Sequence, residues 1–305
     1  MKTPGIHLLP NLKTYRTIWI PALLFILLLG LMSCATTSWN RPLQELSLVS
    51  RISTAEPLFK AVYSERTSTI YGLSKDWQMI HFYREQKRLN SIGGLGTGRA
   101  HFQRLSDIAV DPDGSLLTLD SASKKISKFN AEGQWSGEIE LRGTANPELF
   151  VMSGDQTLYV YDSFQGEIIC YAALDNSELY RFGKFQLYRI SNLNLSREHL
   201  IAYSEADNQS LIYSRLGQLV RTEKGQSAQD DFGNFYNLEQ GFLRSGEYSY
   251  AIGQLTNPIL SYNGGNLIVA AGTQTLLLKP MYHRNNTAAS FAEPSWDVKT
   301  AQRYA

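Results

Sequence analysis

Gly96-Thr-Gly-Arg-Ala-His-Phe102 opens the stretch of sequence that decides the fold, which continues as Leu105-Ser-Asp-Ile-Ala-Val-Asp111-Pro-Asp-Gly114, Leu116-Leu-Thr-Leu-Asp120 and Lys125-Ile-Ser-Lys-Phe129-Asn-Ala-Glu-Gly133. Its apolar runs are four to six residues long, and turn-forming dipeptides such as Asp113-Gly114 separate them. Short alternating apolar runs closed by such dipeptides are typical of antiparallel strands. The stretch therefore predicts one sheet of short antiparallel strands.

The same marks recur along the chain at a spacing of 42 residues. An aromatic residue ends an apolar strand at three equivalent positions: Phe129, Tyr171 and Tyr213. A polar residue closes the strand before it in each unit: Asp120, Asp162 and Ser204. Independent marks at one period of this length indicate a repeat architecture. We predict three tandem units at about residues 97–137, 138–183 and 184–224.

The stretch 96–133 resembles an NHL repeat, the unit of one family of β-propellers. The resemblance implies blades of four antiparallel strands that close into a ring, which removes exposed sheet edges. Two upstream runs, 69–74 and 79–83, fit the second and third strands of an earlier blade that begins near Leu46. Runs between residues 241 and 278 supply a fifth and a sixth blade. We therefore expect an all-β propeller of four-stranded blades, six in number, with five or seven as alternatives.

The N-terminal sequence predicts an export signal. Basic residues precede an apolar run over residues 18–32, which ends in Leu31-Met-Ser-Cys34. This pattern is typical of a secretory signal, whereas a membrane-spanning helix needs about 20 apolar residues. Leu31-Met-Ser-Cys34 resembles the bacterial lipobox, which implies that residues 1–33 are removed and that Cys34 carries lipid. Ala35 in place of Asp implies sorting to the outer membrane. An uncleaved anchor and a plain signal peptide are the alternatives.

The composition of the whole chain, 305 residues of which 43% are hydrophobic, is that of a globular protein with a large core. Without residues 1–33, which carry three basic and no acidic side chains, 26 basic and 28 acidic residues remain. This balance excludes a basic field for nucleic acid. The expected divisions are a lipoprotein signal peptide at 1–33, a lipidated tether at 34–44, the propeller at 45–281 and a mostly disordered tail at 282–305.

Only two cysteines occur in the sequence, Cys34 and Cys170. Because a lipidated Cys34 cannot form a disulfide, packing alone must hold the core. Cys170 lies in the apolar run Ile168-Ile-Cys-Tyr171, which predicts a buried and unreactive thiol.

Four histidines remain after removal of the signal, and they fall in different parts of the chain: His81, His101, His199 and His283. Some propeller lyases that resemble this fold hold an axial metal with histidines from several blades, and zinc takes three or four ligands. No two of these histidines have local ligand spacing, so we interpret them as solvated or hydrogen-bonded and expect neither a metal nor another cofactor. The alternative is a propeller-type lyase or lactonase with an axial metal site that uses His101 and His199.

Two loops resemble ligand-binding motifs in part. Asp111-Pro-Asp-Gly114 has paired carboxylates, as calcium loops do, but a type I turn accounts for its Pro and Gly. Gly93-Gly-Leu-Gly-Thr-Gly98 is as glycine-rich as a phosphate-binding loop. Arg99, however, replaces the last glycine of the G-x-G-x-x-G pattern, and no helix follows. We predict a turn at the first position and an inter-blade loop at the second.

One face of the predicted propeller gathers the candidate interaction residues. In this fold the turns between the second and third strands emerge on the same face as the connections between blades. The candidates on this face are Arg99, His101, Arg104, Asp120, Lys124, Asp162 and Glu205. Mixed charge with interspersed aromatic residues such as Phe164 suits the recognition of a protein surface.

We therefore expect a non-enzymatic β-propeller scaffold for protein–protein interaction in the bacterial cell envelope. The expected location is the periplasmic side of the outer membrane, to which the N-terminal lipid binds. The expected partner is another envelope protein or assembly, and not nucleic acid. The lyase or lactonase is the alternative from another class. A glycan-binding module is a third, and it requires aromatic side chains clustered on the loop face.

Overall fold

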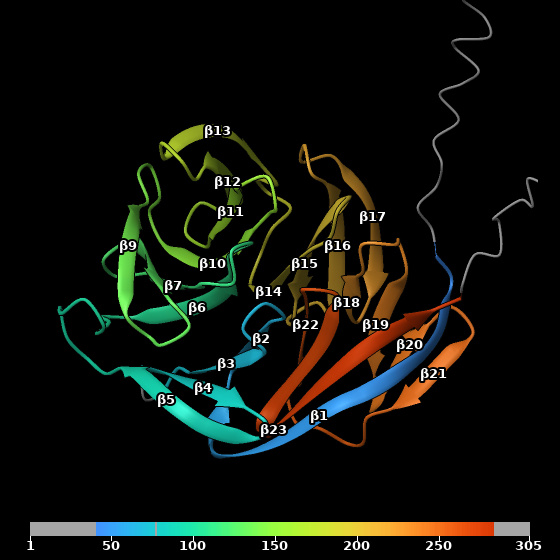
Figure 1. Cartoon of the computed structure of the whole chain (residues 1–305). Helices are drawn as coiled ribbons and strands as arrows, with labels where there is room; N and C mark the ends of the chain where they lie inside the picture. The colour runs from blue at the N-terminus through green and yellow to red at the C-terminus, as the bar shows by residue number, and fades with distance from the viewer. Residues whose placement is uncertain (1–40, 77, 284–305) are drawn as a thin grey trace, which may run out of the picture. The chain divides into compact units, whose positions relative to one another are not determined.

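The computed structural model describes residues 41–76 and 78–283. In this part of the chain there are 23 strands, and all of them belong to six antiparallel sheets. The sheets form the blades of a ring (Figure 1). These residues contain no helix long and apolar enough to cross a membrane. The expected all-β propeller with six blades is confirmed, whereas the predicted signal peptide and Cys34 lie outside the described residues.

Five of the six blades contain four consecutive strands. The first blade consists of β2 (Lys60–Ser64), β3 (Thr69–Ser74), β4 (Met79–Arg84) and β5 (Lys87–Gly93). The second consists of β6 (Leu105–Val110), β7 (Leu116–Asp120), β8 (Lys125–Phe129) and β9 (Trp135–Glu140). The third consists of β10 (Pro147–Met152), β11 (Thr157–Asp162), β12 (Glu167–Ala172) and β13 (Ser177–Phe182).

The fourth blade completes the three tandem units that the 42-residue period predicts. It consists of β14 (Ile190–Leu195), β15 (His199–Ser204), β16 (Gln209–Ser214) and β17 (Leu219–Lys224). The fifth blade has shorter strands: β18 (Gln226–Gln229), β19 (Phe235–Glu239), β20 (Phe242–Ser245) and β21 (Tyr248–Ala251).

The sixth sheet closes the ring with both ends of the described chain. It contains β22 (Ile259–Asn263), β23 (Asn266–Tyr282) and β1 (Leu43–Leu58), in the order β1-β23-β22. β1 pairs with β23 from Leu43 opposite Tyr282 to Leu58 opposite Gly272. The two long strands lie side by side in Figure 1. This sheet therefore has three strands instead of the expected four.

The two ends of the propeller differ from the boundaries drawn from the sequence. Leu46 lies in β1 and pairs with Pro280, so the expectation that the first blade begins near Leu46 is wrong and this blade begins at Lys60. β1 begins at Leu43, within the range expected for the tether, and Tyr282 ends β23 within the range expected for the tail. The pairing of β1 with β23, which closes the ring, determines where the propeller begins and ends.

The first strands of the blades surround a polar axis. Each contacts the first strand of the next blade, and β22 contacts β2. Their inner edges have no strand partner, so side chains of neighbouring blades bind the backbone. Asp107 accepts a hydrogen bond from the backbone N–H of Phe150 at 2.9 Å, and Asn192 donates to the carbonyl of Leu260 at 2.7 Å. Asp107 also forms a buried ion pair with Lys60 at 2.8 Å.

The 42-residue period corresponds to residues packed in the core. Phe129 is the last residue of the third strand of its blade, Tyr171 and Tyr213 are the second-last residues of theirs, and all three are 0% exposed. The ring of Tyr213 lies 5.3 Å from that of Phe182. Gly217 has a φ of +85°, and a Cβ there would lie 2.4 Å from Phe182, so this turn requires glycine for both conformation and space.

The thiol of Cys170 faces the same core. Cys170 lies in β12 and is 0% exposed. Burial raises the pKa of this thiol from 9.0 to about 12. The predicted burial of this thiol is confirmed. Since the thiolate is the reactive form of cysteine, a raised pKa disfavours reaction of Cys170.

Candidate functional site

Two of the predicted face residues, Asp120 and Asp162, are buried and organise the loops around them. Asp120 accepts hydrogen bonds of 2.8–3.3 Å from the backbone N–H groups of Gln103, Arg104, Ala122 and Ser123. Asp162 binds the equivalent four groups of Ala145, Asn146, Phe164 and Gln165. Each carboxylate ties the connection that enters its blade to the turn that follows it, and so builds the loop face from within.

Predicted basic residues reinforce the same loops. Lys124 donates from Nζ to the carbonyl of Thr144 at 2.9 Å. Arg104 donates from Nε to the hydroxyl of Ser121 at 2.5 Å and from Nη2 to the side chain of Asn146. These bonds join the connection into the second blade, its turn and the connection into the third blade, so the turns and connections share one face as expected for a propeller.

Five loops on this face carry positive charge alone. They are the connections 94–104, 141–146 and 183–189 and the turns 121–124 and 163–166. Their charged residues are six cations and no carboxylate: Arg99, Arg104, Lys124, Arg142, Lys184 and Arg189. Lys124 is half-buried and the other five are exposed. We call these five loops the basic loop face.

Three aromatic side chains stand in solvent on the basic loop face. Phe164 is 81% exposed, Phe185 is 95% exposed and Tyr188 is 64% exposed. Phe185 has a φ of +68°, in the left-handed region that bulky residues rarely adopt. The turn with Phe164 packs against the connection with the other two, because a Cβ on Gly166 would lie 3.1 Å from the carbonyl of Leu187. Sequence reasoning singled out Phe164 and missed Phe185 and Tyr188.

The histidines lie apart from one another. His101 is exposed on the basic loop face. His81 is buried with Nε2 2.7 Å from the carboxylate of Glu56, and burial lowers its pKa. His199 is hydrogen-bonded to the side chain of Gln229 at 2.8 Å. Within residues 41–76 and 78–283, no three His, Cys, Asp or Glu side chains gather at one point, so His101 and His199 share no ligand site.

The paired carboxylates of the loop 111–114 belong to a turn, as predicted. The backbone N–H of Gly114 donates to the carbonyl of Asp111 at 2.8 Å. Lys128 Nζ lies 2.6 Å from the carboxylates of both Asp111 and Asp113. The one lysine therefore pairs with both of the acids that suggested a calcium loop.

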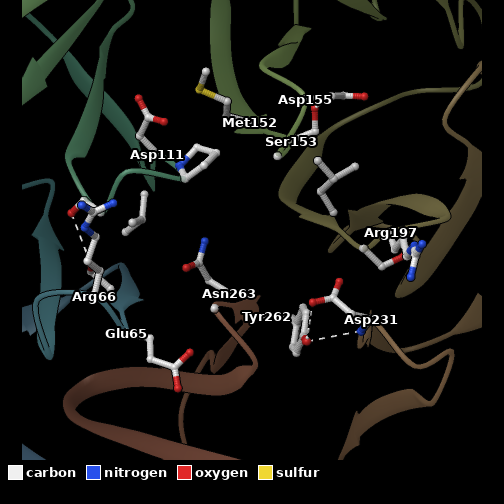
Figure 2. A pocket seen from close by; sticks show the side chains of 18 of the residues that line it. Glu65, Arg66, Asp111, Met152, Ser153, Asp155, Arg197, Asp231, Tyr262 and Asn263 are labelled. Carbon is white, nitrogen blue, oxygen red and sulfur yellow. Dashed lines mark hydrogen bonds between the residues drawn. The ribbon is translucent and has the colours of Figure 1, made fainter. Parts of the chain in front are cut away.

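A cavity of about 700 Å³ opens at the end of the axis opposite the basic loop face. The turns between the first and second strands of the blades line it, and Figure 2 shows Arg66, Asp111, Asp155, Arg197 and Asp231 around it. Its acidic side chains have partners within the protein. The Ser153 hydroxyl and the Arg215 guanidinium hold the pKa of Asp155 down to about 2. Asp231 is hydrogen-bonded to the hydroxyl of Tyr262 at 3.1 Å (Figure 2).

A second cavity, of about 590 Å³, opens at the other end of the axis. Its lining comes from the first, fourth, fifth and sixth blades and includes the predicted residue Glu205 beside Lys75 and Gln226. Its walls are apolar in part, through Phe59 and Pro258 among others. This combination of an apolar wall with a few polar groups is typical of small-molecule sites. No single repeat contains it, so the period that predicts the fold does not predict this cavity.

Comparisons with known proteins support the fold. No protein-family model and no curated protein matches this sequence. Among solved structures the chain is similar to XC5397, a gluconolactonase from Xanthomonas campestris, with 14% identity and a TM-score of 0.57 over 77% of this chain and 89% of that one. It is also similar to the WD40 repeats of RRP9, with 12% identity and a TM-score of 0.55 over 79% of this chain and 99% of that one.

A third similar structure, that of U3-55K, has 12% identity and a TM-score of 0.54, and covers 79% of this chain and 100% of that one. At such low identities these likenesses show the propeller fold alone. The fold is shared by an enzyme and by WD40 repeats, so it does not decide between a catalytic and a binding role.

Proposed function

We propose that this protein is a lipid-anchored scaffold of the bacterial outer membrane whose basic loop face binds an acidic surface of another envelope protein. One observation carries the proposal: five neighbouring loops present six cations, three exposed aromatic rings and no carboxylate. A protein with nearly balanced charge overall has concentrated one sign of charge here. Complementary charge speeds association and selects the partner.

The aromatic residues supply the binding affinity that exposed charges alone do not provide. Exposed charge pairs contribute little affinity in salt, because the Debye length is about 10 Å at 0.1 M ionic strength. Aromatic side chains buried at an interface contribute most of the binding energy in many complexes. Phe185 is held in solvent on a backbone conformation that costs free energy, and such strain is concentrated at functional sites.

The proposed lipid anchor rests on the resemblance of residues 31–34 to a lipobox, and these residues lie outside the described part of the chain. Lipid on Cys34 would hold the propeller at the membrane and leave its loops open to a partner. Cys34→Ser should leave a soluble or uncleaved protein. Unchanged membrane partitioning of the variant would contradict the anchor.

Crosslinking in intact envelopes tests the binding face. A photo-crosslinking residue in place of Tyr188 should form one defined adduct with an acidic protein. Lys184→Glu combined with Arg189→Glu should reduce the adduct several-fold, because both cations lie beside the exposed rings. These residues are preferable to Arg104 and Lys124, which hold the loops through hydrogen bonds.

A matched control uses two exposed cations at the opposite ends of the strands, Arg66 and Lys87. Arg66→Glu combined with Lys87→Glu makes the same change of net charge and should leave the adduct intact. An equal loss of the adduct in both double variants would show that overall charge, and not the basic loop face, determines the capture.

The exposed rings favour a second candidate, a glycan-binding module, because sugars stack on aromatic side chains. Phe185→Ser would then abolish binding to an envelope oligosaccharide, while Lys184→Glu and Arg189→Glu would leave it unchanged. The scaffold predicts instead that Phe185→Ser and the charge reversals both weaken the adduct with a protein, so the charge reversals separate the two candidates. The lactonase alternative has the fold likeness to XC5397 in its favour and no ligand cluster among the described residues.

A further inference from the structure

The cavity of about 590 Å³ at the loop-face end of the axis is lined by two hydrogen-bond donors, on Lys75 and Gln226, that form no hydrogen bond with the described residues. Lys75 lies in the turn after β3 and lines this cavity. Its Nζ is 3.4 Å from the centre of the Phe59 ring and forms no hydrogen bond or ion pair with the described residues. Burial lowers the pKa of this amine, an effect that the charge of Asp107 opposes.

Gln226 supplies a second unpartnered donor. Its side chain is 3% exposed, and its Oε1 accepts the backbone N–H of Leu260 at 2.6 Å. Because that N–H needs an acceptor, the oxygen must face Leu260 and the amide nitrogen must face away. The Nε2 group is buried and has no partner among the described residues. Native proteins rarely leave a buried donor unpaired, so this group points to a bound molecule or ordered water.

The rest of the lining restricts what the cavity can hold. Phe59, Leu58, Leu238, Pro258 and Ile259 form an apolar wall. Two exposed carboxylates, Asp76 and Glu205, stand at its edge. They would repel a ligand with several negative charges, such as a phosphate. A single carboxylate on an apolar body satisfies both the unpaired donors and the wall.

We propose that this cavity binds a small organic monocarboxylate, with Lys75 Nζ and Gln226 Nε2 donating hydrogen bonds to its carboxylate and the apolar wall holding its body. The volume lies within the range of about 300–1,000 Å³ that is typical of ligand pockets. This binding function goes beyond the scaffold role and uses residues outside the basic loop face.

Titration calorimetry on the full chain in detergent tests the proposal with three probes: hexanoate, its neutral analogue hexanamide, and inorganic phosphate. Hexanoate should bind, and the other two should bind at least about tenfold more weakly, because charge-assisted hydrogen bonds are the stronger ones. Hexanamide binding as tightly as hexanoate, or no heat from hexanoate at millimolar concentration, would overturn the proposal.

Variants assign the binding to the two donors. Lys75→Met should weaken hexanoate binding at least about tenfold, and Lys75→Arg should retain most of it because the charge remains. Gln226→Met should also weaken binding, and the lysine pair keeps the test decisive if this variant does not fold. Lys184→Met removes a cation from the basic loop face and should leave hexanoate binding unchanged. Equal affinity of Lys75→Met and the unmodified protein would refute the site.

The scaffold proposal and the cavity proposal are tested by different variants, so either one can fail while the other stands. Charge reversal at Lys184 and Arg189 reports on the protein partner alone, and Lys75→Met reports on the cavity alone. Loss of the protein adduct with intact hexanoate binding supports the scaffold, and loss of hexanoate binding with an intact adduct supports the cavity.

Discussion

A single side chain can build a face without belonging to its surface, as Asp162 does. It is 0% exposed, and its two oxygens accept four backbone N–H groups from two loops. The equivalent residue of the fourth blade is Ser204, whose hydroxyl instead donates to Asp207 at 2.8 Å and accepts the N–H of the same residue. Aspartate at this position therefore organises two loops, whereas serine organises one.

Asp162→Ala should lower the free energy of unfolding. Leaving one buried donor unpaired costs about 1–3 kcal/mol, and this is the smallest loss that we expect. Asp162→Ser, which copies the fourth blade, should lose less, because a hydroxyl can still bind the turn. Phe164→Ala in the same turn is the control and should be neutral, since that side chain is 81% exposed. Urea unfolding of the three variants gives the comparison. Equal stability of the alanine variant and the unmodified protein would mean that water replaces the carboxylate at no cost.

At the scale of elements, the blades from β6 to β17 could be predicted from the sequence because each forms its contacts locally. Their strands are joined by short turns, and a fixed set of residues recurs every 42 positions. β1 could not be predicted as the closing strand, because its partner lies more than 200 residues away and Leu43 faces Tyr282. Local patterns contain no information about which distant strand will complete a sheet.

The candidate site likewise contains residues that the sequence predicts and residues that it does not. Arg99, Arg104 and Lys124 lie on the predicted loops because their places follow from blade topology. The exposure of Phe185 depends on its positive φ, and no sequence pattern predicts this backbone conformation for a phenylalanine. The axial cavities depend on side chains from several blades, so they appear only once the ring has closed.

Closure by β1 can be tested at Ile52. This side chain is 2% exposed and packs in a cluster with Leu58, Ile268 and Leu277 that joins the closing sheet to the first blade. Ile52→Ala should destabilise the propeller by about 2–5 kcal/mol through the cavity it leaves. Arg51→Ala changes the exposed neighbour in the same strand and should be neutral. Protease cleavage within residues 43–58 should rise for Ile52→Ala alone, and equal cleavage in both variants would show that closure does not depend on this contact.

At the scale of the whole molecule, buried tyrosines connect the stability of the ring to pH. They occur in five of the six blades, and burial raises the pKa of each: Tyr71, Tyr161, Tyr171, Tyr213, Tyr236 and Tyr262. For Tyr171 and Tyr213 the pKa rises from 10.0 to about 12. Because the buried tyrosines are spread over five blades, their ionisation at high pH should destabilise the whole ring and not one blade.

Alkaline pH should therefore unfold the propeller in one cooperative transition. Above pH 10 the unfolded chain releases phenolic protons that the native protein keeps, so the native state binds more protons and its stability falls as pH rises. Stability from this source is complete below pH 10 and is lost between pH 10 and 12 for Tyr171 and Tyr213. Urea unfolding across this range, with tyrosinate absorbance followed in parallel, measures the effect.

Tyr213→Phe separates ionisation from packing. The variant loses the hydrogen bond from the hydroxyl to Gln186 at 3.0 Å, so it should be less stable at neutral pH by about 0.5–1.5 kcal/mol. It also loses one group whose pKa is higher in the native protein than in the unfolded chain, so its stability should fall less steeply above pH 10. If the pH dependence is unchanged in the variant, or if all tyrosines ionise near pH 10 while the strands stay folded, the buried phenols do not control the alkaline limit of the ring.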